Sequence, residues 1–410
     1  MERDESMSLP GDALQPTADD DPRGGRARRG TKPATDAAQR TTPPHNHPAN
    51  ARRGAKPATD VAQRTRGAAA GVELGVQIVP TMGSAELIDT IVCAEQLGYA
   101  YCMVADEGLM LDVYAVLGAA ARQTDTIRLG AVTNPYTRHP AATAAALATV
   151  DEMSGGRAFV TLVAGGTMVL NPMGLERSEP LALLDDTITA LRMLWSGEPV
   201  DWQGRKLRLQ DAQITTGAHS IPIWMAARGE RMLSLAGSAC DGLVLMVKSD
   251  LEDAISIAEK ARASRASRPD RPGQQDLAPL RVYLDRLAYR PEMIDEAKHL
   301  YGYAVMDSPP RILKNLGLDE AGIAELKQAF ESGGPEAVGR LITDELVAEY
   351  QIAGTPEQCR DQLQQMIAAH RLDAFFLNVI SPGLDANREL MTEVAAIAAA
   401  AQPARQQQSH

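Results

Sequence analysis

From Val72 onward, short runs of apolar residues alternate with longer stretches in which apolar and polar residues recur at helical spacing. The first helical stretch is "SAELIDTIVCAEQLG", where Leu87, Ile91 and Ala94 share one side of a helix. Gly98 follows as the residue that ends this helix. The apolar runs have the length of strands. The predicted strands are, in chain order, "VELGVQIVP", "YAYCMVAD", "TIRLGAV", "RAFVTLV", "IPIWMAA", "DGLVLMV", "RVYLDRLAY" and "DAFFLNV".

Eight buried strands joined by helices require parallel pairing with right-handed crossovers. The pattern therefore predicts an α/β protein with a closed (β/α)8 TIM barrel over residues 71–402, whose functional end is the carboxyl side of the strands. A doubly wound open sheet is the main alternative, but its GxGxxG fingerprint is absent from the first strand-to-helix junction, "VPTMGSAE". The pattern from about residue 291 to residue 349 is mostly typical of helices, with breaks at "MDSPP" and "ESGGPEAVG". It predicts a helical insertion before the last strand.

Residues 1–70 differ in composition from the rest of the chain. They are rich in Pro, Gly, Ala, Thr, Arg and Asp and have almost no large apolar residues, so we expect a disordered tail. Within it, "RRGTKPATDAAQRT" at Arg28 recurs as "RRGAKPATDVAQRT" at Arg52. Two copies without an apolar stripe do not predict a solenoid.

The net charge and the cysteines limit which ligands, partners and covalent links are expected. The formal net charge of the 410 residues is -12, which disfavours nucleic acid and anionic membranes, so we expect a small-molecule substrate. No apolar run is long enough to cross a bilayer, and a secretory signal is absent, so a cytoplasmic location is expected. The four cysteines form no CxxC pair, and neither disulfides nor a metal site are expected; they are Cys93, Cys102, Cys240 and Cys359.

Two adjacent carboxylates, Asp106 and Glu107, follow the second predicted strand. At a barrel mouth they could serve as acid and base. Successive residues point apart, however, and a carboxylate that caps the backbone of the loop is the structural alternative.

The third strand runs into "VTNPYTRHP", in which two prolines bracket a turn. Asn134 and Thr137 can bond backbone groups locally, and Pro140 is suited to the first position of a helix. His139 has no second histidine or carboxylate at metal spacing, which favours a structural role.

Small residues follow two further strands. Gly165 and Gly166, after the fourth strand, allow the backbone to approach a ligand closely. Ala226, Ala227 and Gly229 stand at the start of a helix, where free N–H groups and the helix dipole favour an anion such as phosphate.

Taken together, these segments resemble the luciferase-like monooxygenase superfamily, in the branch similar to deazaflavin-dependent methylenetetrahydromethanopterin reductase. The resemblance covers residues 72–380, and the segment that begins "DTIRLGAVTNPYTRHP" is the most specific. The other segments that carry it are "AEQLGYAYCMVADEG", "IPIWMAARGERMLSLAGSACDGLVLM" and "IAGTPEQCRDQLQQMIAAH".

The resemblance implies a barrel that binds coenzyme F420, a 5-deazaflavin, or FMN at the carboxyl end of the strands. It implies a bulge with a non-prolyl cis peptide at Ala131–Val132 behind the ring, and a homodimer. The implied cofactor contacts are Thr133 and Asn134 at the ring, Gly165 and Gly166 along the side chain, and Ala226, Ala227 and Gly229 near the phosphate.

Three positions depart from the family pattern. Gln77 stands where pterin reductases carry a carboxylate, Thr167 where they carry an acidic residue, and Glu107 where related dehydrogenases carry a histidine. Gln77 and Thr167 are therefore expected to contact a different substrate, with Glu107 as proton donor. The sequence predicts an F420-dependent oxidoreductase; the alternatives are an FMN-dependent monooxygenase and a non-catalytic barrel without cofactor.

Overall fold

The eight predicted strands form a closed barrel in the computed structural model, which describes residues 72–265, 278–306, 308–380 and 383–401. All neighbouring strands are parallel, in the order β1-β10-β9-β8-β7-β4-β3-β2. The predicted tail, residues 1–70, lies outside the described residues. The barrel strands are β1 (Glu73–Ile78), β2 (Tyr101–Ala105), β3 (Arg128–Thr133), β4 (Ala158–Leu162), β7 (Ile223–Ala226), β8 (Gly242–Leu245), β9 (Leu280–Asp285) and β10 (Ala374–Val379).

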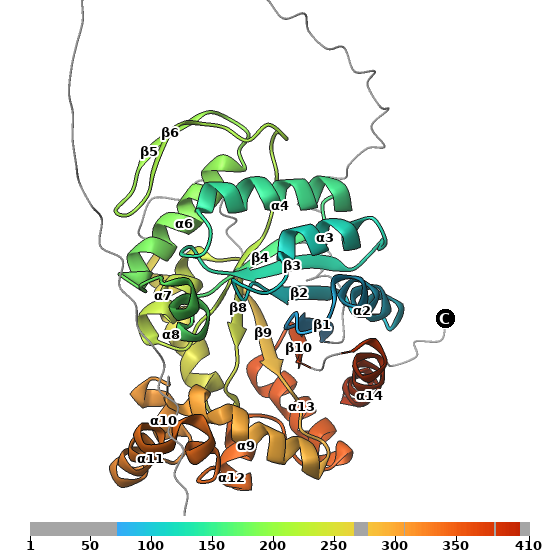
Figure 1. Ribbon diagram of the computed structural model, residues 1–410, viewed down its shortest axis with the longest axis vertical. Coiled ribbons are helices and arrows are strands. Elements are labelled where there is room, and N and C mark those ends of the chain that lie inside the picture. Colours follow the sequence, from blue (N-terminus) through green and yellow to red (C-terminus); the bar gives the residue numbers. More distant parts are fainter. Residues whose placement is uncertain (1–71, 266–277, 307, 381–382, 402–410) are drawn as a thin grey trace, which may run out of the picture. The chain divides into compact units, whose positions relative to one another are not determined.

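Helices follow the strands and surround the barrel (Figure 1). None of the described helices combines the length and apolar character needed to cross a membrane. Those in the first half are α2 (Ser84–Gln96), α3 (Val113–Ala121), α4 (Pro140–Ser154), α5 (Thr167–Leu170), the 3-10 turn η1 (Asn171–Met173) and α6 (Pro180–Leu194). Those between β7 and β9 are α7 (Glu230–Ala239), η2 (Lys248–Asp250) and α8 (Leu251–Arg265). The remaining two that follow the barrel pattern are α13 (Pro356–His370) and α14 (Leu384–Ala401).

The helical insertion lies where the sequence predicts it, between β9 and β10. Its helices are α9 (Pro291–Met306), α10 (Pro310–Asn315), α11 (Glu320–Gly339) and α12 (Asp344–Tyr350). They enclose a second apolar cluster, in which Ile312, Val338 and Val347 are fully buried. Arg311 of α10 anchors this unit by an ion pair of 2.7 Å to Asp250, after β8.

The sequence prediction missed one element, an antiparallel hairpin between α6 and β7. It consists of β5 (Val200–Gln203) and β6 (Arg208–Ala212). The Asp186 carboxylate of α6 accepts the backbone N–H groups of Lys206 and Leu207 at the hairpin turn. A carboxylate on a separate helix thus helps to hold the turn, which is why a local pattern did not indicate it.

Aromatic side chains fill the barrel interior near the amino ends of the strands and form the floor of the barrel. The rings of Phe159 and Trp224 lie 4.5 Å apart, and Tyr101 packs at 5.3 Å from Trp224. Glycines on neighbouring strands make room for these rings: a Cβ on Gly130 would stand 2.4 Å from Phe159, and one on Gly242 2.5 Å from Trp224. The interior is packed at this level, so a ligand can enter only from the carboxyl end.

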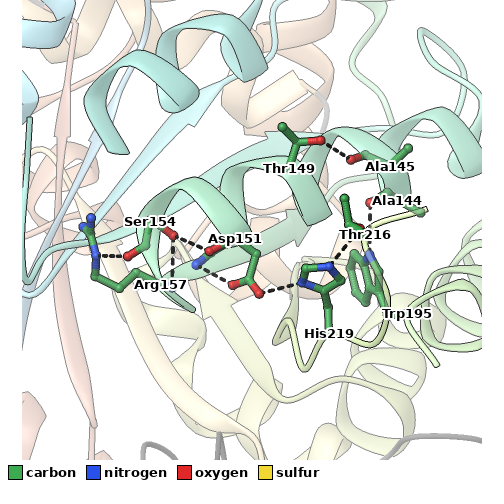
Figure 2. A network of polar contacts seen from close by, with 10 residues as sticks. Ala144, Ala145, Thr149, Asp151, Ser154, Arg157, Trp195, Thr216 and His219 are labelled. Carbon is green, nitrogen blue, oxygen red and sulfur yellow. Dashed lines mark hydrogen bonds and ion pairs between the residues drawn. The ribbon is translucent and has the colours of Figure 1, made fainter. Parts of the chain in front are cut away.

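A polar network at the amino end of the barrel serves the fold (Figure 2). His219 Nδ1 lies 2.8 Å from Asp151 Oδ2, and its Nε2 lies 2.9 Å from Thr216 Oγ1. Asp151 also accepts the backbone N–H of Ala158, at the start of β4. Arg157 donates to backbone carbonyls at the end of α3 and beyond it. These groups join α4 to the loop before β7, at the end opposite to the expected site.

Candidate active site

The predicted site residues come together at one end of the barrel, because parallel strands end on the same side. Within the barrel, Gln77 of β1 lies level with Met103 of β2 and with Asn378 of β10. Asp106 and Glu107 follow β2 directly, and the backbone N–H of Asp106 bonds the carbonyl of Val132 at 2.8 Å.

The two adjacent carboxylates have different environments. Thr133 Oγ1 donates to Asp106 Oδ2 at 2.8 Å, and the backbone N–H of Gly108 reaches Asp106 Oδ1 at 3.4 Å. Thr133 is only 1% exposed, so it fixes the orientation of the Asp106 carboxylate. The structural alternative, a carboxylate that bonds the loop backbone, is thus seen for Asp106.

The Glu107 carboxyl group is half-buried and makes no hydrogen bond within the described residues. Burial raises the pKa of Glu107, and the charge of the neighbouring Asp106 raises it further. A carboxyl with a raised pKa keeps its proton to higher pH, which is the property of a proton donor.

The end of β3 differs from the sequence prediction in one respect. No peptide bond is cis among the described residues, so the expected cis bond at Ala131–Val132 is wrong for this structure. Strand pairing is regular here: Val132 lies opposite Ala105 of β2 and Thr161 of β4. Because the ladder continues to Thr133, no unpaired residue is left to form a bulge.

The polar segment after β3 builds a turn and a helix cap. Asn134 is 3% exposed, and its Oδ1 accepts the backbone N–H groups of Tyr136 and Thr137. His139 Nδ1 accepts the N–H of Ala141, and Pro140 occupies the first position of α4. The structural interpretation of His139 is therefore confirmed, and the oxygen of Asn134 is engaged in the turn.

The glycine pair after β4 has an open side. Gly165 has a φ of 81°, and a Cβ there would stand 3.0 Å from Leu170 and 3.2 Å from Tyr136. Gly166 precedes α5, and no heavy atom lies within 4 Å of where its Cβ would be. Thr167 is exposed on α5.

The start of α7 leaves backbone N–H groups available. Gly229 occupies the N-cap with φ -75° and ψ 144°, and no side chain caps the helix. A Cβ on Gly229 would meet no atom within 4 Å. Before it, Ala227 is buried and Ala226 is half-buried. The Arg228 side chain turns away and donates to the carbonyl of Ala304 in the insertion.

Three of the exposed large apolar side chains lie in the segments that follow β2 and β4 at this end of the barrel. Leu109 and Met110 follow β2, and Met168, in α5, is 65% exposed. The two segments touch, because a Cβ on Gly108 would stand 2.7 Å from Sδ of Met173 in η1.

Comparison with known proteins identifies the family. Residues 64–370 match the luciferase-like monooxygenase family. The chain belongs to the luciferase-like monooxygenase family. A 5,10-methylenetetrahydromethanopterin reductase of Archaeoglobus fulgidus is 30% identical over 312 residues, which are 73% of this chain and 91% of that protein. The corresponding protein of Methanolobus tindarius is 29% identical over 296 residues, 72% of this chain and 90% of that protein.

A solved structure has the same fold as this luciferase-like chain. The coenzyme F420-dependent tetrahydromethanopterin reductase of Methanopyrus kandleri superposes with a TM-score of 0.68 at 24% identity, over 79% of this chain and 97% of that one. The resemblance seen in the sequence is therefore confirmed, and as an enzyme of this family the chain is an oxidoreductase.

Two residues near the candidate site escaped the sequence prediction. Asn378 lies inside the barrel and accepts a hydrogen bond of 3.2 Å from Gln77 Nε2. Tyr114, in α3, is buried, and its burial raises the pKa of the phenol, which the hydroxyls of Thr133 and Thr143 offset in part. A polar residue two positions after Phe376 in an apolar strand was a usable signal for Asn378.

Proposed function

We propose that the protein is a coenzyme F420-dependent oxidoreductase that transfers a hydride between the deazaflavin and a small organic substrate. The observation that carries the proposal is the similarity to two relatives, each matched over about nine-tenths of its length. Both relatives are named as pterin reductases. The reductase of Methanopyrus kandleri, which has the same fold, is F420-dependent by name. FMN-dependent monooxygenation is the alternative within the same fold.

The residues at the carboxyl end are compatible with a long anionic cofactor. Gly166 and Gly229 face open space, and the uncapped N-terminus of α7 offers N–H groups to a phosphate. We assign Ala226, Ala227 and Gly229 to the phosphate end and Gly165 and Gly166 to the side chain. The ring is assigned to Ala131, Val132, Thr133 and Asn134 at the end of β3.

The chemistry divides between cofactor and protein. When bound, the deazaflavin supplies or accepts the hydride at its carbon 5. Glu107 holds the proton that balances this hydride, because burial keeps its carboxyl protonated to higher pH. Asp106, fixed by Thr133, positions the loop that carries Glu107. Leu109, Met110 and Met168 would contact apolar parts of the ligands.

Gln77 and Thr167 are assigned to the substrate. Both are uncharged where the pterin reductases of the family carry carboxylates, so the substrate is proposed to differ from methylenetetrahydromethanopterin. A homodimer and a cytoplasmic location stay predictions from the sequence.

The cofactor is tested by titrating the full chain with F420 and, separately, with FMN, and following intrinsic fluorescence of the tryptophans, which include Trp224 in the barrel floor. F420 should bind more tightly. Tight FMN binding without F420 binding would overturn the proposal in favour of a monooxygenase. Binding of neither would favour a barrel without cofactor.

The phosphate end has its own test. Gly229→Asp places a negative charge at the N-cap of α7 and should weaken F420 binding by about tenfold, or ~1.4 kcal/mol. Gly83→Asp is the matched control, because Gly83 is the extended, open N-cap of α2. Equal effects of the two variants would contradict the assignment of the phosphate to α7.

A further inference from the structure

Two uncharged amide side chains stand together inside the barrel, directly above its aromatic floor. Gly75 and Phe376 face the interior, because a Cβ on Gly75 would stand 2.4 Å from the Phe376 ring. Gln77 and Asn378 follow them by two residues and therefore point to the same side of their strands. They lie level in register on β1 and β10, and Gln77 Nε2 donates to Asn378 Oδ1 at 3.2 Å.

This pair leaves one carbonyl oxygen beside one amide nitrogen without a hydrogen bond. Gln77 Oε1 and Asn378 Nδ2 make no hydrogen bond within the part of the chain that the structure describes. If both amides were turned by 180°, the same combination would remain, with the roles exchanged between the two residues. The edge that the pair presents is thus an adjacent donor and acceptor, whichever orientation holds.

The edge selects a ligand by its pattern of hydrogen bonds. An anion such as a carboxylate needs two donors, and a cation such as an amidinium needs two acceptors. A carboxamide or lactam has a carbonyl beside an N–H and matches one donor and one acceptor. Both residues are half-buried, so a mismatched ligand leaves a polar group without a partner, and sites of this kind discriminate strongly.

We propose that the Gln77–Asn378 pair is a specificity site for an uncharged substrate that carries a carboxamide or lactam group. The proposal rests on the proposed function, because it names the substrate class for the same barrel mouth. It assigns Asn378 a role in binding and gives a physical reason for an uncharged residue at Gln77.

Three small probes of similar shape test the pattern. Benzamide has the matching carbonyl and N–H, benzoate replaces the N–H by a charged oxygen, and N,N-dimethylbenzamide lacks the N–H. Saturation-transfer NMR on the full chain, with and without F420, should show benzamide bound at least tenfold more tightly than the other two. Equal binding of benzamide and benzoate would overturn the proposal.

A variant that should change which probe binds best, rather than only weaken binding, gives a second test. In Asn378→Asp, Gln77 Nε2 can still donate to the side chain at position 378, so the free edge of the pair holds Gln77 Oε1 and a carboxylate oxygen, both acceptors. The preference should therefore move from benzamide to benzamidine, whose N–H groups are all donors. Gln365→Glu, which adds the same charge at an exposed position of α13, should leave benzamide preferred. An Asn378→Asp protein that still prefers benzamide would contradict the proposal. If Asn378→Asp does not fold, Asn378→Ala must weaken benzamide at least tenfold.

The cofactor titration separates this inference from the proposed function. F420 binding without discrimination among the probes would overturn the substrate class and leave the oxidoreductase in place. Selective benzamide binding without F420 binding would support the recognition site and overturn the proposed function.

Discussion

Thr133 Oγ1 donates a hydrogen bond of 2.8 Å to Asp106 Oδ2 and so joins the carboxyl ends of β3 and β2. Thr133 is buried, while Asp106 is half-buried at the mouth of the barrel. The bond orients one carboxylate of an adjacent pair and leaves the other, Glu107, with its raised pKa, without a hydrogen bond among the described residues. This difference in environment underlies the proposed roles, in which Asp106 positions the loop and Glu107 holds the proton.

Thr133→Val keeps the shape of the side chain and removes the donor to Asp106. Because this is a hydrogen bond to a charged group, we expect a loss of about 2 kcal/mol in the free energy of unfolding, measured by urea denaturation. F420 affinity should fall as well. Thr149→Val is the control, because Thr149 is exposed and bonds only a carbonyl within α4. Equal losses in the two variants would argue against a special role for the bond.

Glu107→Gln should lower turnover by about 100-fold or more and leave F420 binding intact, because the amide cannot give up a proton. In the direction that consumes a proton, kcat/KM of the wild type should fall as pH rises through the raised pKa of Glu107. This limb of the pH profile should be missing from the variant. Unchanged turnover with retained F420 binding would dispose of Glu107 as the donor.

Asp250 should make the stability of the fold depend on pH, with a sign that follows from its raised pKa. Burial, only partly opposed by Arg311, raises its pKa to about 6 from 3.8. The folded protein therefore holds this proton more strongly than the unfolded chain, and stability should fall as pH rises from about 4 to 6. In Asp250→Asn this contribution should vanish, as urea denaturation at the two ends of the window can measure. A variant whose stability falls by as much as that of the wild type would contradict the assignment.

Gly242→Ala tests the packing of the barrel floor. The added Cβ would stand 2.5 Å from Trp224 Cδ1, so the indole must shift, and we expect a loss of about 1–3 kcal/mol and a lower Tm. Gly83→Ala is the control, because its φ is -66° and a Cβ there meets nothing within 4 Å. A Gly242→Ala protein as stable as this control would show that the floor is not tightly packed.

Much of the fold could be predicted because barrel strands carry local signals. Buried parallel strands are apolar at nearly every position, and the stretches between them have helical spacing, so β1 and β10 were located without knowledge of their pairing. The β5–β6 hairpin was missed, because its turn is held by Asp186 of α6.

The site could be predicted only in its location. The carboxyl ends of the strands follow from the barrel, and in the structure Glu107, Gly166 and Gly229 follow β2, β4 and β7 at those ends. The direction in which each side chain points could not be predicted from the sequence pattern. Asn134 bonds its own turn, and the bond between Ala131 and Val132 is trans within a regular ladder.

By itself, the sequence determined the eight strands, the helical insertion and the family, since these depend on periodicity and on residues near one another in the chain. Only the tertiary structure decided that Gln77 meets Asn378, 301 residues away, and that Thr133 holds Asp106. The physical reason is closure of the barrel: it brings the first and last strands into register and converts distant polar residues into hydrogen-bonded partners.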